Sequence, residues 1–157
     1  MQENLKVKFK KLHPNTVIPQ YAKSGDAGVD LTAVSIEFNK KLGCITYDTG
    51  LSVEIPEGYV GLIFPRSSIY KTIHSLSNSV GVIDSGYRGS IKFNFRDAYD
   101  PTGDLEDRWN KFNPDFYNVG DRIGQLVIIP YPKIQFEEVE ELSETDRSDG
   151  GFGSTNK

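Results

Sequence analysis

The 157-residue chain contains one cysteine, Cys44, which excludes an internal disulfide bond and a cysteine cluster for a metal ion. We expect Cys44, beside Ile45, in the core, and the two histidines, His13 and His74, on the surface. No apolar run approaches the roughly 20 residues that cross a membrane. The N-terminal residues lack the long apolar segment of a signal peptide. These absences favour a cytoplasmic protein that does not contact a membrane.

Positive charge is also in short supply. The formal net charge is −4, which argues against a general surface for nucleic acids. A few local donors could still bind one nucleotide. With 37% hydrophobic and 25% charged residues, 15 glycines and 8 prolines, the chain is typical of a soluble, turn-rich globular protein. Its length suits one domain, which at this size buries about 70% of its unfolded surface.

Long helical patterns and internal repeats are absent too, and short apolar segments take their place. Segments 5–10, 36–38, 45–47, 51–56, 59–64, 123–130 and 136–142 read as strands. One helical turn is expected within 68–77 and a short helix near 105–112. Many short strands with almost no helix predict an all-β barrel or sandwich.

The stretch from Asn78 to Phe95 predicts a β-hairpin, in which two strands are joined by a tight turn. Val80, Val82 and Ile83 form one apolar arm, and Ile91, Phe93 and Phe95 alternate along the other. The turn, Asp84-Ser-Gly-Tyr87-Arg-Gly, holds a carboxylate and an aromatic ring on a loop fixed by a scaffold, where catalytic groups often lie. The simpler interpretation is a turn whose aspartate bonds its own backbone.

Three segments have groups suited to binding phosphate. Pro65-Arg66-Ser67-Ser68 follows a strand and offers a guanidinium, two hydroxyls and turn amides. Gln125 adds an uncharged donor, and Arg147 precedes a glycine-rich end that contains Phe152. The Gly-Lys-Ser/Thr of a Walker A loop is absent. Taken singly, the first segment could be only a turn and the last only a mobile end, but a ring in such an end suggests closure over a flat ligand.

These segments together resemble the trimeric dUTP pyrophosphatases (dUTPases). Five motifs of that family occur in order: Ala27-Gly-Val-Asp-Leu31, Pro65-Arg-Ser-Ser68, Gly81-Val-Ile-Asp-Ser-Gly-Tyr-Arg-Gly89, Gly120-Asp-Arg-Ile-Gly-Gln125, and the tail from Arg147 to Thr155. Five motifs in register across nearly the whole chain form a specific signature.

The resemblance implies a jelly-roll-like β-barrel in residues 1–145 and a C-terminal arm in 146–157. It implies a homotrimer whose active sites each draw on three subunits, the arm of one closing over a site built by the others. Asp84 would be the general base for water attack on the α-phosphorus of dUTP. Mg²⁺ would be held mainly by the triphosphate, with Asp30 acting through metal-bound water.

The resemblance also implies a substrate-binding set. The backbone of Gly81 and Lys92, with Asn78 nearby, would read uracil, and Tyr87 would pack on the deoxyribose. A site built to pair with uracil would leave its groups unpaired against cytosine. Phe152 would stack over the base. The phosphates would be bound by the remaining residues of the set, which are Arg66, Ser67, Ser68, Gln125, Arg147, Gly153, Ser154 and Thr155.

Two features depart from the common pattern of that family. Asp149 puts a negative charge in the last motif, near the expected γ-phosphate. The segment from Asp97 to Tyr117 is longer than in compact members. It reads as a solvated loop, but its aromatic residues could also cover a subunit edge or dock a protein partner; they are Trp109, Phe112, Phe116 and Tyr117.

Two other functions remain open. A dCTP deaminase on the same fold would share Pro-Arg-Ser-Ser and the strand order, but would lack the glycine-rich arm. A trimeric nucleotide-sensing or regulatory protein would have lost the general base. The presence of Asp84, Tyr87 and the arm favours dUTP hydrolysis over both.

Overall fold

The computed structural model describes residues 4–78, 80–98, 104–111 and 116–150. These residues form ten strands, a short 3₁₀ helix and an α-helix. In chain order the elements are β1 (Lys8–Lys11), β2 (Val29–Thr32), β3 (Ser35–Asn39), β4 (Cys44–Asp48), β5 (Leu51–Glu54), β6 (Tyr59–Pro65), η1 (Ser67–Lys71), β7 (His74–Leu76), β8 (Gly81–Ile83), β9 (Lys92–Asp97), α1 (Leu105–Lys111) and β10 (Arg122–Pro130).

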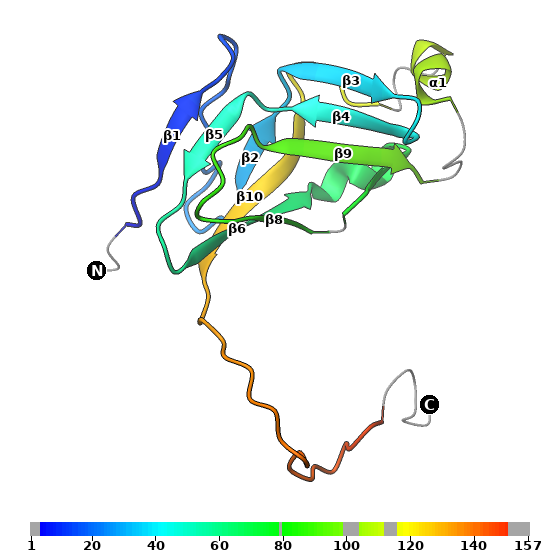
Figure 1. Cartoon of the computed structure of the whole chain (residues 1–157). Coiled ribbons are helices and arrows are strands. Elements are labelled where there is room, and N and C mark those ends of the chain that lie inside the picture. The colour runs from blue at the N-terminus through cyan, green and yellow to red at the C-terminus, as the bar shows by residue number, and fades with distance from the viewer. Residues whose placement is uncertain (1–3, 79, 99–103, 112–115, 151–157) are drawn as a thin grey trace.

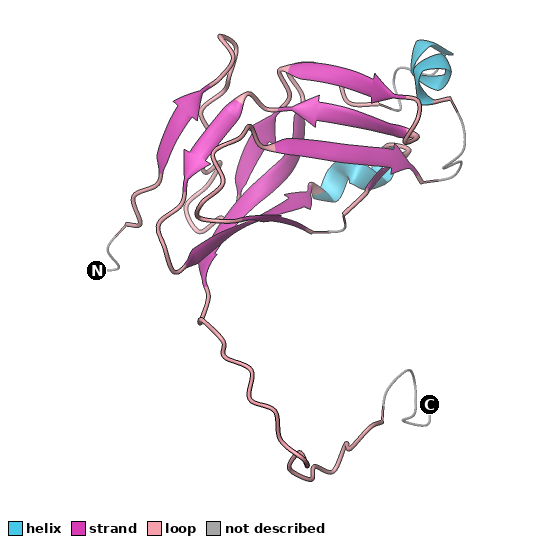
Figure 2. Ribbon diagram, viewed as in Figure 1, coloured by secondary structure: helices cyan, strands magenta, loops and turns pink. Residues whose placement is uncertain are grey.

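The strands build two facing layers (Figures 1 and 2). One sheet has the order β2-β10-β6-β8, the other has the order β3-β4-β9-β7, and β1 pairs with β5 in a small third sheet. All of these pairs are antiparallel. The all-β class expected from the short apolar segments is confirmed.

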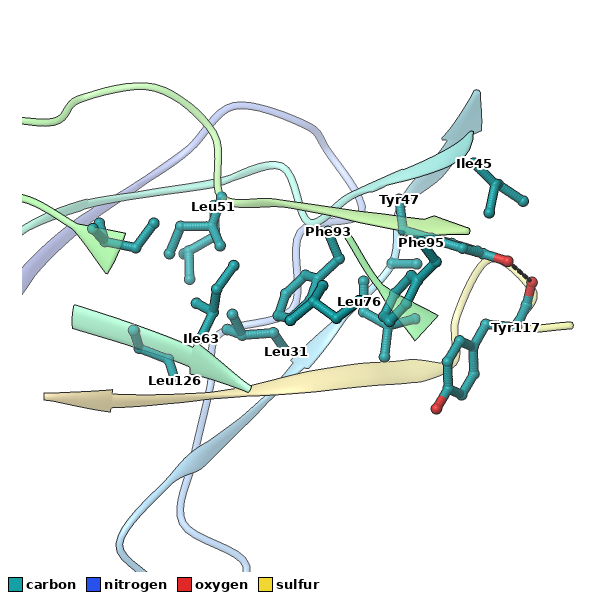
Figure 3. Packing of buried hydrophobic residues seen from close by; sticks show 14 of the residues in the cluster. Leu31, Ile45, Tyr47, Leu51, Ile63, Leu76, Phe93, Phe95, Tyr117 and Leu126 are labelled. Carbon is teal, nitrogen blue, oxygen red and sulfur yellow. Dashed lines mark hydrogen bonds between the residues drawn. The ribbon is translucent and has the colours of Figure 1, made fainter. Parts of the chain in front are cut away.

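The core lies between the two layers (Figure 3). Leu31 and Ile63 reach inward from one sheet, and Tyr47, Phe93 and Phe95 from the other. The alternation predicted for the second arm of the 78–95 stretch is present, because β9 buries every second side chain. Each fully buried side chain of this size contributes about 1.5–3 kcal/mol relative to an exposed one. Cys44 is buried, as expected.

The expected hairpin is not a hydrogen-bonded pair. β8 pairs with β6 in one sheet, whereas β9 pairs with β4 and β7 in the other. The chain therefore crosses from one layer to the other through the Asp84–Tyr87 turn, which is closed by the Tyr87 N–H donating to the Asp84 carbonyl at 3.0 Å. In the described part of this stretch, no ladder of hydrogen bonds therefore joins the two arms, and the space between the layers lies between them.

His74 is buried, contrary to the expected surface position. It is 4% exposed, and its ring packs against Tyr47, Phe95, Phe116 and Tyr117. In β7 the side chains of His74 and Leu76 point inward while the serine between them is exposed. The alternation of His74, Ser75 and Leu76 could have indicated a strand with a buried histidine. The polar residues around this segment favoured a surface position instead.

The segment between β9 and β10, which we call the excursion, packs aromatic side chains against the rest of the same chain. Phe116 and Tyr117 belong to the buried core, and Trp109 on α1 packs edge-on against Phe38 with ring centroids 6.0 Å apart. Arg108 forms an ion pair with the buried Asp97, which ties α1 to β9. Phe112 lies outside the described residues. Docking of a protein partner on this segment stays a prediction. Phe116 and Tyr117 cannot belong to such a surface, because they are buried.

Tyr131 and Lys133 are still bonded to Gly58 and Glu57 of the body, and residues 134–150 then run away from the folded layers as an extended chain (Figure 1). The strand expected at 136–142 is not formed: Phe136 and Leu142 are 91% and 88% exposed and pair with no strand of this chain. The division into a body of residues 1–145 and an arm of 146–157 stays a prediction. Within the described part of the chain, no helix has the length and apolar character needed to span a bilayer.

Candidate active site

A pocket of about 310 Å³ opens between the two arms of the 78–95 stretch. We call it the arch pocket. Asp84 and Tyr87 come from the turn, Lys92 and Asn94 from β9, and Ile63 from β6. The full lining is Ile63, Asn78, Gly81, Val82, Ile83, Asp84, Tyr87, Ser90, Lys92 and Asn94. It exists because the arms belong to different sheets.

Glycine at position 81 gives the Ile63 side chain its space in the wall of the arch pocket. A Cβ atom there would overlap the side chain of Ile63 and approach the Asn78 side-chain nitrogen to 3.1 Å. Gly81 pairs with Ile63 across the β6–β8 ladder, so neither backbone can move aside without loss of pairing. The absence of a side chain at this position lets Ile63 pack directly against the β8 backbone in the wall of the pocket.

A cluster of hydrogen bonds around Asp48 fixes the opposite arm. Asp48, at the end of β4, accepts hydrogen bonds from the Ser90 hydroxyl and from the Gly50 N–H, the latter at 2.7 Å, and pairs with Lys92 at 3.2 Å. Burial raises the pKa of the Asp48 carboxyl, but the bonds from Ser90, Gly50 and Lys92 outweigh burial and hold it below its usual value. The Tyr87 hydroxyl adds a bond to the Ser90 carbonyl at 3.0 Å.

A second constellation lies at the far end of β6. Asp30 on β2 accepts from the Arg66 Nε at 3.1 Å and from the Gln125 side-chain amide at 3.3 Å through Oδ1. Its Oδ2 accepts from an Arg122 guanidinium nitrogen at 2.9 Å. The Asp30 side chain is 16% exposed, so these are partly desolvated ion pairs. One carboxylate thus holds three donors contributed by β10 and the end of β6.

The approach of β2 to β10 depends on a small residue. A Cβ on Gly28 would lie 3.3 Å from Val127 and 3.5 Å from the Gln125 Cβ. The small residues before Asp30 were expected to let the backbone pass close to another group, and that group is β10. The Asp30 carboxylate is thereby brought within reach of the β10 side chains.

Beside these ion pairs is a cationic pocket of about 370 Å³, which we call the arginine cradle. Arg66, Lys71 and Arg122 give it positive charge, and Ser68 and Tyr117 give it hydroxyls. Its lining is completed by Thr72, Phe116, Gly120 and Asp121. Guanidinium groups and hydroxyls suit phosphate oxygens, which accept hydrogen bonds and carry negative charge. Among the described residues, the cradle and the arch pocket share no lining residue.

Comparison with known proteins shows which family the chain belongs to. The family model for dUTPase matches residues 15–101 and 108–156. The chain belongs to the dUTPase family. The interruption in the match falls at residues 102–107, inside the excursion between β9 and β10.

Individual dUTPases match over nearly the whole chain. The deoxyuridine 5'-triphosphate nucleotidohydrolase of Hydrogenobaculum sp. (strain Y04AAS1) is 38% identical, covering 96% of this chain and 98% of the relative. That of Escherichia phage T5 is also 38% identical, covering 95% and 97%. Among solved structures, the dUTPase of Staphylococcus bacteriophage 80alpha with dUPNHPP superposes with a TM-score of 0.78 at 27% identity, covering 97% of this chain and 99% of that one. The jelly-roll-like fold expected from the motifs is confirmed.

The dUTPase motifs divide between the two pockets. Of the residues predicted to bind substrate, Asn78, Gly81, Tyr87 and Lys92 line the arch pocket together with Asp84. Arg66 and Ser68 line the arginine cradle, Gln125 is bonded to Asp30 beside it, and Ser67 is exposed on η1. The roles assigned to these residues stay predictions.

The last dUTPase motif lies apart from both pockets. Arg147 is exposed on the extended segment, and its Nε donates to the Gly150 carbonyl at 3.0 Å. The remaining predicted arm residues lie outside the described residues; they are Phe152, Gly153, Ser154 and Thr155.

Reasoning from the motifs missed several residues of these sites. Arg122 stands inside the motif at Gly120 and was given no role, although its side chain pairs with Asp30. Asp48 and Tyr117 lie outside every motif, and no local pattern marks them. Tyr117 reaches the arginine cradle through core packing, and Asp48 holds Ser90 and Lys92 of the arch pocket through strand pairing. Spacing along the chain reveals neither relationship.

Proposed function

We propose that this protein hydrolyses dUTP to dUMP and pyrophosphate, removing dUTP from the precursors of DNA and supplying dUMP for dTMP synthesis. The observation that supports this most is the arch pocket, in which an exposed carboxylate, Asp84, stands beside a space bounded by Gly81 and Lys92. Such a space suits a flat base, and the carboxylate stands near the sugar side, beside Tyr87. Membership of the dUTPase family supports the same reaction.

Base selection would rest on the backbone of the two arms. Uracil presents a donor at N3 and an acceptor at O4, and cytosine reverses both. Backbone groups at Gly81 and Lys92 cannot exchange donor and acceptor, so cytosine would leave them unpaired, and such mismatches discriminate by roughly 10⁴–10⁵. The narrow space between the two arms would also exclude the methyl group of thymine. The Tyr87 ring would pack where a ribose 2′-hydroxyl would lie.

Asp84 would act as the general base. The oxygen of a water forms a bond to the α-phosphorus, and the water's proton passes to the Asp84 carboxylate. The bond from the α-phosphorus to the oxygen shared with the β-phosphate breaks, and its electrons leave with pyrophosphate. A positioned base contributes about 10²–10⁴ in rate. Most of the remaining acceleration comes from electrostatic stabilisation of the phosphate charge, in which Arg66 would participate.

The site suits Mg²⁺ that is held mainly by the nucleotide. Among the described residues, no group of three carboxylates, histidines or cysteines could hold a metal alone. Oδ1 of Asp30 already accepts two hydrogen bonds, whereas Oδ2 accepts one, from Arg122. A carboxylate oxygen has two lone pairs, so Oδ2 keeps one for a metal-bound water. Bound Mg²⁺ supplies charge neutralisation to the triphosphate.

A complete site would draw on more than one subunit of a homotrimer. The arch pocket and the arginine cradle share no described lining residue, and beyond Lys133, which pairs with Glu57, the described C-terminal residues run away from the body. One nucleotide needs its base and phosphates bound together. We propose that the cradle of one subunit meets the arch pocket of a second, and that the arm of a third closes over both with Arg147 on the phosphates and Phe152 on the base. We place the trimer in the cytoplasm.

The deciding measurement is pyrophosphate release in Mg²⁺ buffer with dUTP, dCTP, dTTP or UTP at equal concentration. Release from dUTP alone is the expected result. Uridine nucleotide formed from dCTP would instead indicate a deaminase. Binding of dUTP without release from any substrate would indicate a regulatory protein. Omitting Mg²⁺ should reduce the rate with dUTP, and an unchanged rate would contradict the role given to the ion.

A further inference from the structure

Tyr117 has a buried hydroxyl that the fold leaves without a partner. The residue is 7% exposed, and its Oη makes no hydrogen bond within the part of the chain that the structure describes. A buried polar group without a bond costs about 1–3 kcal/mol of stability. A phenylalanine would fill the same space without that cost. The stability of the folded chain therefore does not explain the oxygen, whereas a role in ligand binding would.

The rest of Tyr117 is held on several sides. The Tyr47 hydroxyl donates to the Tyr117 carbonyl at 3.1 Å and lies 3.0 Å from Nε2 of His74. The Tyr117 ring packs against His74 and Phe95, with centroid separations of 5.2 and 5.9 Å. Figure 3 shows the bond from Tyr47 on one side of the residue and the phenol oxygen pointing away from it. The ring therefore cannot turn its hydroxyl back to a partner in the core.

The hydroxyl instead faces the arginine cradle. Tyr117, Ser68 and Arg66 all line that pocket. Burial raises the pKa of the Tyr117 phenol, while Ser68, whose hydroxyl is near enough to interact with the phenol oxygen without meeting hydrogen-bond geometry, and the charge of Arg66 lower it. The phenol therefore keeps its proton at neutral pH and is available as a hydrogen-bond donor.

We propose that Tyr117 is a positioning residue of the phosphate site, whose hydroxyl donates to the Ser68 hydroxyl when a nucleoside triphosphate occupies the arginine cradle. A serine hydroxyl has one proton and two lone pairs. With a lone pair engaged by Tyr117, the Ser68 proton is directed to a phosphate oxygen, which can only accept. The proposal rests on the proposed function, because it names a further contributor to the same site.

The test is Tyr117→Phe in the full chain, which removes one oxygen and keeps the ring and its backbone acceptor. Calorimetry would compare dUpNHpp, a triphosphate analogue that resists cleavage, with dUMP. We expect a loss of about 3- to 10-fold in affinity for dUpNHpp, the size of one neutral hydrogen bond. Affinity for dUMP should change less than about twofold, since dUMP lacks the outer phosphates. Tyr59→Phe, outside both pockets, is the matched control.

A double-mutant cycle separates this role from a structural one. If Tyr117 acts through Ser68, Tyr117→Phe should cost little further affinity for dUpNHpp once Ser68→Ala is present. In steady-state assays KM should rise while kcat stays within about twofold. The melting temperature of the ligand-free variant should equal or exceed that of the wild type, because an unpaired buried hydroxyl is removed.

Three outcomes would overturn the role of Tyr117. They are unchanged affinity of Tyr117→Phe for dUpNHpp, equal losses for dUpNHpp and dUMP, or fully additive effects with Ser68→Ala. Failure of the wild type to bind dUpNHpp would overturn the proposed function together with this role. An intact wild-type affinity beside an unaffected variant would overturn the role of Tyr117 alone.

Discussion

The Nε of Arg66 lies 3.1 Å from Oδ1 of Asp30, so that a carboxylate on β2 fixes a guanidinium at the end of β6. Both side chains are partly buried, at 26% and 16% exposure, and Arg122 shares the same carboxylate. Removing the acid would leave two like charges close together in a partly desolvated site. Asp30 therefore fixes the Arg66 and Arg122 side chains beside the arginine cradle.

Asp30→Asn should lower both stability and catalysis. We expect a loss of about 1–3 kcal/mol in the free energy of unfolding, because charged hydrogen bonds in a partly buried place are lost. We expect kcat/KM for dUTP to fall by about 10-fold or more, because Arg66 loses its fixed orientation. Urea unfolding and initial rates measure the two effects. Glu54→Gln, which breaks an exposed pair with Lys8, should have a smaller effect on both.

Asp84→Asn should separate binding from turnover. The amide keeps the size of the side chain but cannot take a proton, so kcat should fall by about 10² or more. The affinity for dUpNHpp should stay within a few-fold of wild type. Rates and calorimetry on the same preparation would show this, with Asp107→Asn on the exposed face of α1 as control. Near-normal kcat would remove Asp84 from the role of general base.

Gly81→Ala should displace Ile63, which lines the arch pocket. Its new Cβ would overlap Ile63 across the β6–β8 ladder, and overpacking of this kind costs about 1–3 kcal/mol. We expect KM for dUTP to rise and the melting temperature to fall. Gly86→Ala is a matched control in the same loop, because a Cβ there meets no atom within 4 Å. Equal behaviour of the two variants would argue against a base pocket at Gly81.

His74 should make stability depend on pH below neutrality. Burial lowers its pKa from 6.5 to about 4, although Asp97 acts in the opposite direction. Between these two values the unfolded chain binds a proton that the folded chain excludes, so stability is complete above pH 6.5 and falls as the pH drops towards 4. The loss at this histidine should approach roughly 3 kcal/mol at pH 4.

His74→Gln should remove that part of the pH dependence. Urea unfolding at several pH values between 4 and 7 would measure it, with His13→Gln as the control because His13 is the other histidine of the chain. The Gln variant should be less stable at pH 7, where the packing with Tyr47 is disturbed, but its stability should vary less with pH. A slope equal to that of the wild type would assign the effect to other groups.

Two inactive variants should complement each other if the active sites are shared between subunits. A chain ending at Thr145 should fold but lose most of its activity, because the arm is missing. Asp84→Asn keeps the arm but lacks the base. Unfolding and refolding the two together should restore part of the wild-type rate, since some sites would combine an intact Asp84 with an intact arm. An inactive mixture of mixed trimers, or full activity of the truncated chain, would contradict the shared site.

The stretch of residues 78–95 shows which features local sequence can predict. The Asp84–Tyr87 turn and the inward alternation of Phe93 and Phe95 could be predicted, because turn residues and side-chain direction depend on immediate neighbours. Pairing of the two arms with each other was a wrong prediction. Strand partners are chosen by burial of whole faces, and here β8 and β9 each find a better partner in a different sheet.

The sequence analysis missed Arg122, Asp48 and Tyr117 for one reason, which is that their contacts join residues far apart in the chain. Asp30 bonds to partners 36, 92 and 95 positions away in the chain, and Asp48 reaches Ser90 across 42 positions. No window of sequence contains both members of such a pair. The five dUTPase motifs were nevertheless found without the structure, since each is a short run of turn, charged and hydroxyl residues.

For this protein, sequence alone determined the all-β class and the dUTPase family, because periodicity and motifs are properties of neighbouring residues. Tertiary structure decided that the arms around Asp84 open into a pocket, that one carboxylate gathers Arg66, Arg122 and Gln125, and that His74 is buried. It also directed the Tyr117 hydroxyl towards Ser68. Each of these depends on strand register and core packing between segments far apart in the chain, where burial and geometry outweigh local preference.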